Sequence, residues 1–160
     1  MKNITIVDYG SGNVLSAQKS FIKIAKENNL QANVIISKKL NDIKNSTHIV
    51  LPGQGAFSTC MNGLKKTDGL IDELCEFALV KKKPFLGICV GMQMLAKISE
   101  ESRVHEGLGW IDGQIKLLPG DNLKLPHMGW NLATSTNSKY NNLISTKDDY
   151  YFVHSYYFDC

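Results

Sequence analysis

The segment that most constrains the fold is Gly87-Ile88-Cys89-Val90-Gly91, which lies between an apolar run at residues 84–86 and a second one at residues 92–98. This arrangement predicts a strand that turns abruptly into a helix, with Cys89 on the turn. The backbone at such a turn is strained, and flanking side chains would collide there. Glycine on both sides removes the collision, so the segment predicts an α/β unit that presents Cys89.

Cys89 is a candidate nucleophile because of this position. The free N–H groups and the positive dipole end of the following helix face the sulfur, which favours thiolate over thiol and supplies donors for an oxyanion. The alternative is a small apolar cysteine that closes a buried parallel strand, as free cysteines often do. The two glycines and the strand-to-helix context favour the nucleophile.

The N-terminal two thirds of the chain alternates strand and helix patterns, which predicts a doubly wound, mostly parallel α/β sheet flanked by helices. The expected strands are residues 3–7, 32–36, 48–51 and the run into Cys89. The expected helices are residues 14–27, 69–80 and 92–98. In the first helix we expect four side chains to face the core, and we expect Asp68 to cap the second helix. The four are Leu15, Phe21, Ile22 and Ala25.

The last third changes character, because short segments separated by Gly, Pro and Asn replace the helices. Residues 111–118, 123–132 and 150–158 are expected to add antiparallel or mixed strands to the sheet. No repeat, low-complexity tract or linker marks a second domain. We therefore expect one domain over residues 1–160.

Composition narrows the function classes. The chain has 160 residues, 43% of them hydrophobic, which is enough for one core. The net charge of +3 includes the run Lys81-Lys82-Lys83 before Pro84, where a solvated helix end explains the lysines better than nucleic acid does. The apolar run at residues 4–7 is short and ends at Asp8, so it predicts neither a signal peptide nor a membrane span.

The four cysteines are Cys60, Cys75, Cys89 and Cys160, and they form no CxxC pair and no metal-binding spacing with the four histidines. Free thiols in a reducing cytosol are the simplest account of them. We therefore expect a cytoplasmic protein that binds no metal, nucleic acid or membrane.

Two glycine turns lie at expected strand ends. Gly10-Ser11-Gly12 lacks the third glycine of a dinucleotide fingerprint, since Leu15 stands there, and no GK[ST] follows. We expect no cofactor, but a tight turn that presents polar groups at the sheet end.

The second turn, Leu51-Pro52-Gly53-Gln54-Gly55-Ala56-Phe57, places two glycines at the carboxyl edge of the sheet, where open α/β sheets bind ligands. An oxyanion hole needs two N–H groups aimed at one point. Val90, after the nucleophile, supplies one, and an amide of the Gly53–Gly55 loop is positioned to supply the other. The alternative is an ordinary Pro-Gly turn.

At this point a family resemblance emerges. The stretches GICVGMQML and LPGQGAF resemble the class I, triad-type glutamine amidotransferases. DYGSGN, EGLGWIDGQIKLLP, PHMGWN and FVHSYY are similar to the glutaminase subunits of imidazole glycerol phosphate synthases, and the resemblance runs over residues 4–156. It implies a flavodoxin-like fold and a cysteine that attacks the side-chain amide of glutamine. It also implies release of ammonia for histidine biosynthesis.

The resemblance implies roles for individual residues. Cys89 would form the glutamyl thioester, and the amides of Val90 and Gln54 match the oxyanion-hole positions. Gln93, one helical turn after Cys89, would hold the amino-acid end of glutamine. The glutamine site would also include Gly53 and Gly55 and the backbone of His154, Ser155 and Tyr156.

The same resemblance implies a docking face for a cyclase subunit with a TIM-barrel fold, to which ammonia is passed. Asn13, Met128, Trp130 and Asn131 match this face. An aromatic beside polar groups suits an interface anchor, but the pattern places Trp130 equally well in the core.

The family's general base, a histidine in an FHPE-type motif with a nearby glutamate, has no counterpart in this sequence. His48, His105 and His127 are better interpreted as structural or interfacial, and His154 is the remaining alternative. We expect that the 160 residues are incomplete at the C-terminus and inactive by themselves. Two other functions stay open: a paralogue that donates ammonia to amidino-sugar synthesis, and a non-catalytic interaction module.

Overall fold

The computed structural model describes residues 1–120, 124–135 and 148–160. These residues form two compact units, one of Met1–Lys116 with Phe158–Cys160 and one of Leu117–Tyr157. No helix of the described residues is long and apolar enough to cross a membrane.

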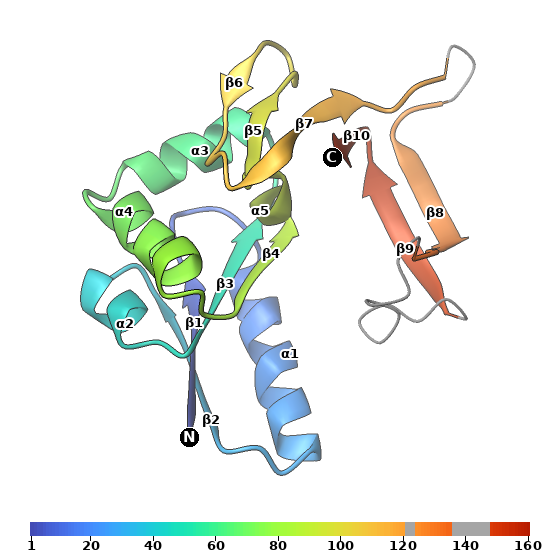
Figure 1. The fold of residues 1–160 in the computed structure, drawn as a ribbon. Helices are drawn as coiled ribbons and strands as arrows, with labels where there is room; N and C mark the ends of the chain where they lie inside the picture. The colour runs from blue at the N-terminus through green and yellow to red at the C-terminus, as the bar shows by residue number, and fades with distance from the viewer. Residues whose placement is uncertain (121–123, 136–147) are drawn as a thin grey trace. The chain divides into compact units, whose positions relative to one another are not determined.

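The first unit is built around a parallel sheet of four strands in the order β2-β1-β3-β4 (Figure 1). The strands are β1 (Lys2–Val7), β2 (Ala32–Ser37), β3 (His48–Gly53) and β4 (Phe85–Cys89). All three pairings are parallel, as expected from strands that alternate with helices. Gly53 and Cys89 are paired at the carboxyl ends of β3 and β4, so the loop after β3 starts beside the helical segment that follows Cys89.

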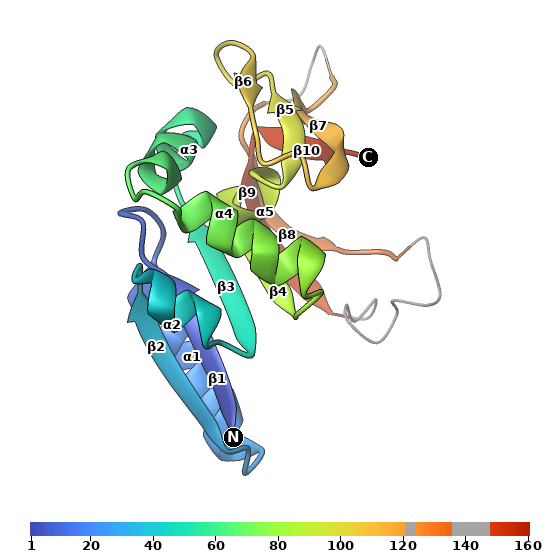
Figure 2. The same ribbon diagram turned by 60° about the vertical axis from the view of Figure 1, so that its left-hand side comes forward.

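Helices lie on both faces of this sheet, which confirms the doubly wound α/β class. Helix α1 (Val14–Glu27) lies on one face, and α2 (Leu40–Lys44) and α4 (Leu70–Cys75) lie on the other (Figures 1 and 2). Helix α3 (Phe57–Lys65) precedes α4, and a π-helical turn (η1, Glu76–Val80) continues it. The sequence analysis missed α2 and α3. Burial of side chains such as Leu51, Leu64 and Phe77 stabilises this unit by about 1.5–3 kcal/mol each.

Helix α1 turns a different stripe toward the sheet than we expected. Val14, Ala17 and Phe21 pack against the sheet core, a spacing of three and four residues that keeps them on one face. Leu15 and Ile22 each follow a packed residue, about 100° further around the helix, and they are 61% and 47% exposed. The expectation was right for Phe21 and the half-buried Ala25, and wrong for the other two.

The start of α4 also differs from the prediction. The N-cap is Gly69, in the left-handed region at φ 73°, with no side-chain cap, so the predicted cap at Asp68 is wrong. Glycine adopts this conformation without the steric cost that other residues incur. The chain therefore enters the helix through a backbone turn.

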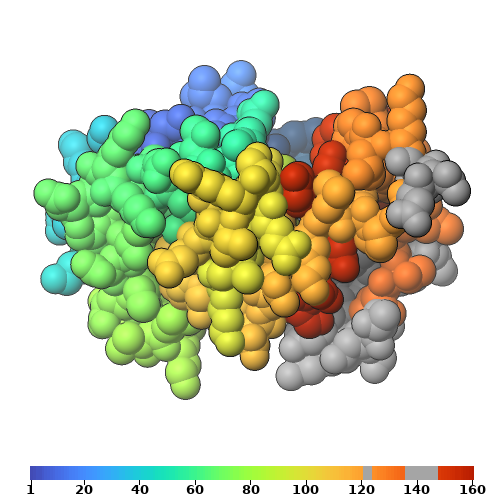
Figure 3. All heavy atoms as spheres, turned by 90° about the horizontal axis from the view of Figure 1, so that it is seen from above, coloured from blue at the N-terminus to red at the C-terminus, as the bar shows by residue number. Residues whose placement is uncertain are grey.

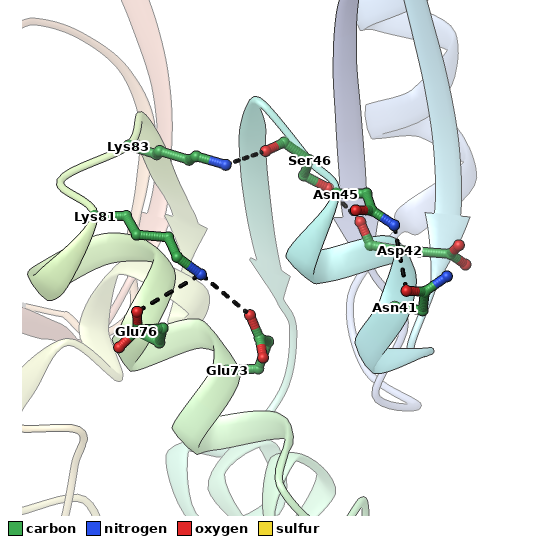
Figure 4. A network of polar contacts seen from close by, with 8 residues as sticks. All are labelled: Asn41, Asp42, Asn45, Ser46, Glu73, Glu76, Lys81 and Lys83. Atoms are coloured by element: carbon green, nitrogen blue, oxygen red, sulfur yellow. Dashed lines mark hydrogen bonds and ion pairs between the residues drawn. The ribbon is translucent and has the colours of Figure 1, made fainter.

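The helical run ends at Val80, as the lysine run predicts, but these lysines are not simply solvated. Figure 4 shows Lys81 between two glutamates of the same helical run, with Nζ to Oε1 distances of 3.9 Å to Glu73 and 3.6 Å to Glu76. Lys83 Nζ donates to the Ser46 carbonyl at 2.9 Å, after the end of α2. This hydrogen bond connects the segment before β4, the strand that ends at Cys89, with the segment between α2 and β3.

A second sheet replaces the predicted helix at residues 92–98. Helix α5 spans only Val90–Gln93, and β5 (Ala96–Ser99) follows it. β5 pairs antiparallel with β6 (His105–Glu106) and parallel with β7 (Ile111–Leu117), in the sheet order β10-β7-β5-β6. The β5–β6 segment lies beside the α3–α4 segment on the face shown in Figure 3. These strands form a sheet of their own, so the expectation that the later strands extend the first sheet is wrong.

The second unit contains an antiparallel hairpin of β8 (His127–Leu132) and β9 (Asp149–His154). The predicted strand at residues 123–132 is shorter in the structure, and Leu123 lies outside the described residues. The predicted strand at residues 150–158 is interrupted at Ser155, after which β10 (Tyr156–Asp159) begins. The mixed and antiparallel character that we expected for this third of the chain is confirmed.

Candidate active site

Cys89 occupies the turn between β4 and α5, as the sequence predicts. Its backbone adopts φ 55° and ψ −121°, a positive φ that non-glycine residues rarely take. Its side chain is exposed. The alternative of a buried cysteine that closes a strand is therefore wrong for this chain.

Three glycines allow β3, β4 and α5 to meet at this turn. A Cβ atom on Gly91 would lie 1.8 Å from the Leu51 carbonyl oxygen, and one on Gly87 would lie 2.6 Å from the Met92 Cα. A Cβ on Gly53 would lie 2.4 Å from the Gly91 nitrogen. All three collisions are with backbone atoms, so larger residues would push the elements apart. The close approach also keeps the N-terminus of α5 against the end of β3.

The loop after β3 begins beside the nucleophile, because Gly53 pairs with Cys89. Gln54, Gly55 and Ala56 are exposed, and Gly55 has φ 91°. The loop ends where α3 begins, and the Glu101 carboxylate accepts a 2.6 Å hydrogen bond from the Phe57 N–H there.

The Gly10-Ser11-Gly12 turn contacts this loop directly. Ser11 Oγ donates to the Gln54 carbonyl at 2.8 Å and accepts from the Gln54 N–H at 3.4 Å. A Cβ on Gly12 would lie 3.0 Å from the Pro52 carbonyl carbon, and the backbone there has φ 88°, so glycine suits this close approach. The turn therefore presents polar groups at the sheet end, as the sequence analysis expects.

Two further side chains reach the loop that the sequence analysis did not connect with it. The buried Tyr9 hydroxyl donates to the Pro52 carbonyl at 2.5 Å. Burial, followed by the neighbouring Cys60 thiol, raises the pKa of Tyr9 far above its ordinary value, so the hydroxyl keeps its proton. Cys60, buried on α3, has its sulfur 3.5 Å from the Gln54 carbonyl oxygen. No local sequence pattern identifies these partners, since they meet only through the fold.

Gln93 is the last residue of α5 and is half-buried. An offset of four residues returns to the same helix face, so Gln93 follows Cys89 on one side of this turn. The Val90 N–H opens the helix, where an amide has no partner within the helix itself. Val90 and Gln93 thus begin and end the helix that follows Cys89, and the Gly53–Gly55 loop begins beside Cys89.

The structure places the four histidines at different sites. His48 begins β3, at the opposite end of the strand from Gly53, and burial followed by the charge of Lys2 lowers its pKa. His105 pairs with Ser99 across β6 and β5. His127 and His154 belong to the second unit. Within the first unit, neither His48 nor His105 is hydrogen-bonded to Cys89.

Residues 154–156, which the resemblance assigns to glutamine binding, lie in the second unit, at the junction of β9 and β10. His154 Nδ1 donates to the Tyr156 carbonyl at 2.9 Å, and its Nε2 lies 3.2 Å from His127 Nδ1. The Ser155 carbonyl accepts from the Leu118 N–H at 2.9 Å. The bend at Ser155 is thus held by a histidine pair on one side and by a backbone contact on the other.

The residues expected at a partner interface are exposed. Met128, Trp130 and Asn131 are on β8, and Trp130 is 72% exposed. The placement of Trp130 in a core is therefore wrong for the described residues. Asn13 caps α1, with its side-chain oxygen accepting from the Ser16 N–H at 3.1 Å.

Comparison with known proteins decides the family. The family model for class-I glutamine amidotransferases matches residues 5–160. The chain belongs to the class-I glutamine amidotransferase family. In this family member the Cys89 turn and the adjoining glycine loop lie on the matched segment, together with the second unit.

Curated relatives of this glutamine amidotransferase are named imidazole glycerol phosphate synthase subunit HisH. The chain is 45% identical to the one from Pelagibacter ubique (strain HTCC1062) over 98% of its own length and 75% of the relative. It is 42% identical to the one from Rhodospirillum rubrum over 97% and 74% of the two chains. For Brucella abortus (strain 2308) the identity is 40% over 98% and 75%. The chain thus spans about three quarters of the length of these relatives.

Proposed function

We propose that this chain is the glutaminase subunit of an imidazole glycerol phosphate synthase, which hydrolyses glutamine and passes ammonia to a cyclase subunit. One observation carries the proposal: the exposed Cys89 stands on a strained strand-to-helix turn, directly beside the start of the glycine loop after β3. The names and identity levels of the relatives support the pathway, histidine biosynthesis. They also favour it over the amidino-sugar alternative.

The chemistry begins with attack of the Cys89 thiolate on the side-chain carbonyl carbon of glutamine. A C–S bond forms and the carbonyl oxygen becomes negative, so N–H groups aimed at that oxygen lower the barrier. We assign these donors to Val90 and to the Gln54 position of the loop. The C–N bond then breaks, the amide NH2 takes up the proton lost from the Cys89 thiol and leaves as ammonia, and water cleaves the thioester to give glutamate and the free thiol.

Substrate binding is assigned to two groups of residues. Gln93, on the same side of the turn as Cys89, holds the amino-acid end of glutamine, and the backbone of Gly53 and Gly55 lines the reacting end. The resemblance also assigns the backbone of His154, Ser155 and Tyr156, in the second unit, to glutamine binding. The hydrogen bonds of His154 and Ser155 support this assignment, because they fix the bend on which the three residues lie.

The partner is a TIM-barrel cyclase, and the two subunits form a heterodimer in the cytoplasm. We assign docking to Met128, Trp130, Asn131 and Asn13. The exposure of the β8 side chains supports this role for them. For Asn13 the structure also supplies a second role, as the cap of α1. Free thiols at all four cysteines suit a reducing compartment.

The decisive test is labelling of the full-length protein with a diazoketone analogue of glutamine, followed by peptide mass spectrometry. We expect stoichiometric modification at Cys89, competition by glutamine, and no modification in Cys89→Ala. Cys160→Ala, which removes another exposed thiol, is the matched control and should label normally. Labelling that persists in Cys89→Ala would remove Cys89 as the nucleophile.

A further inference from the structure

His127 and His154 form a hydrogen-bonded pair across the β8–β9 hairpin. The strand register places the two residues opposite each other, and His127 Nδ1 lies 3.2 Å from His154 Nε2. The other ring nitrogen of His154, Nδ1, donates to the Tyr156 carbonyl at 2.9 Å. Two hydrogen bonds in series therefore lead from His127, at the start of β8, to the bend that follows β9.

The proton positions on the two rings follow from these contacts. A carbonyl oxygen only accepts hydrogen bonds, so His154 Nδ1 carries a hydrogen. In the neutral imidazole the second nitrogen is then an acceptor, so His154 Nε2 receives its hydrogen bond from His127 Nδ1. His127 is thus the donor that holds His154 in this tautomer.

Ring packing places the two histidines but does not fix the orientation of His154. His127 stacks on Phe152, with ring centroids 5.4 Å apart and an interplanar angle of 28°. The rings of His127 and His154 meet nearly edge to face, at 5.3 Å and 70°. A flip of the His154 ring about its Cβ–Cγ bond would keep much of this packing, but it would turn Nδ1 away from the Tyr156 carbonyl. The hydrogen bond from His127 therefore selects the orientation in which His154 holds the backbone.

The bend at Ser155 depends on two carbonyl contacts. The Leu118 N–H donates to the Ser155 carbonyl at 2.9 Å, and His154 Nδ1 donates to the Tyr156 carbonyl. Because a trans peptide is planar, a held carbonyl also fixes the direction of the N–H in the same peptide group, which belongs to the next residue. The Leu118 contact therefore orients the Tyr156 N–H, and the His154 contact orients the Tyr157 N–H.

We propose that His127 is a positioning residue for glutamine binding, because its Nδ1 hydrogen bond holds the ring of His154, which in turn holds the backbone at residues 154–156. The inference rests on the proposed glutaminase function, in which this backbone binds glutamine. His127 itself takes no part in bond making. Its loss should therefore weaken the binding of glutamine without slowing the attack by Cys89.

The test measures how labelling of Cys89 depends on the concentration of the diazoketone analogue, which carries the same amino-acid end as glutamine. His127→Phe keeps an aromatic ring against Phe152 but has no donor. In this variant we expect the half-saturating concentration to rise about five-fold, an effect of the size of one hydrogen bond, with the limiting rate unchanged. His127→Asn, whose side-chain amide places a donor near the position of Nδ1, should restore most of the binding.

The matched control is His105→Ala, which removes a histidine from β6 in the first unit and should leave the half-saturating concentration unchanged. An unchanged half-saturating concentration in His127→Phe would overturn the proposal. A defect that His127→Asn does not relieve would overturn it as well, since the ring and not the donor would then be required.

The proton positions provide a second measurement, which needs no substitution. Nuclear magnetic resonance correlation of the imidazole nitrogens with their hydrogens, at neutral pH, should show His154 with a hydrogen on Nδ1 and none on Nε2. A hydrogen on His154 Nε2 would overturn the assignment of His127 as the donor. Absence of Cys89 labelling in the unaltered protein would instead overturn the glutaminase function.

Discussion

The residues around Cys89 show which parts of a site follow from local sequence. The glycines at positions 87 and 91 predict a tight strand-to-helix turn, and the structure has this turn with a positive φ at Cys89. A side chain at either flanking position would collide, as expected, and the atoms that it would meet belong to the Leu51 carbonyl and the Met92 backbone.

Gly91→Ala should therefore be among the most destabilising substitutions in the chain. The new Cβ would lie 1.8 Å from the Leu51 carbonyl oxygen, so β3 and α5 must separate. We expect the free energy of unfolding to fall by about 3 kcal/mol or more, since overpacking against rigid backbone is costly. Urea denaturation followed by circular dichroism measures this change.

Gly55→Ala is the control for this prediction. Its Cβ would meet nothing within 4 Å, and only the positive φ of 91° opposes it. The expected cost is about 1–2 kcal/mol. Equal losses in the two variants would contradict the close packing at Gly91.

At the scale of elements, strands bounded by turns were easier to predict than helix lengths. The run after Cys89 is apolar throughout, so it does not distinguish a long helix from a short helix followed by a strand. Strand pairing determines which of the two forms. Because residues 96–99 pair with β6 on one side and β7 on the other, they form β5, and α5 ends at Gln93. Likewise α1 was predicted correctly in extent, but the choice of its buried stripe depends on how it lies against the sheet.

The β8–β9 hairpin has an apolar face that the sequence alone left ambiguous. The register places Met128 opposite Val153 and Trp130 opposite Tyr151. All four side chains are more than half exposed, and the Trp130 and Tyr151 rings meet edge to face at 5.5 Å. An apolar patch of this kind, on one face of a hairpin, is typical of a protein interface.

Trp130→Ala should weaken binding of the cyclase by about 30-fold, since a large aromatic anchor at an interface contributes about 2 kcal/mol or more. Titration of the purified full-length protein with the cyclase, followed by calorimetry, measures the dissociation constant. Val104→Ala, at an exposed apolar residue of the first unit, should leave it unchanged. Full affinity in Trp130→Ala would exclude this face as the docking surface.

At the scale of the whole molecule, one requirement of the chemistry is not met by a contact in the described residues. The thiol proton must be stored during attack and returned to the departing ammonia. His48 lies at the far end of β3, and neither His48 nor His105, the two histidines of the first unit, is hydrogen-bonded to Cys89. The missing FHPE-type motif predicts this, whereas the division of the later strands between separate sheets follows only from the fold.

We expect the 160-residue chain to release glutamate at a negligible rate even with the cyclase present, because a nucleophile without a base is acylated slowly and does not turn over. A coupled glutamate assay measures the rate. Appreciable turnover that disappears in His154→Ala would instead identify His154 as the base. Turnover that survives in His154→Ala would contradict the expectation that these residues lack a working proton shuttle.

The positive φ of Cys89 has a consequence for how this position is maintained over time. A non-glycine residue in that region costs about 1–3 kcal/mol, so glycine would be the more stable occupant of the turn. Selection for stability alone would therefore favour replacement of Cys89 by glycine. If cysteine is kept at this position in related sequences, it is kept by selection for activity, despite its cost in stability.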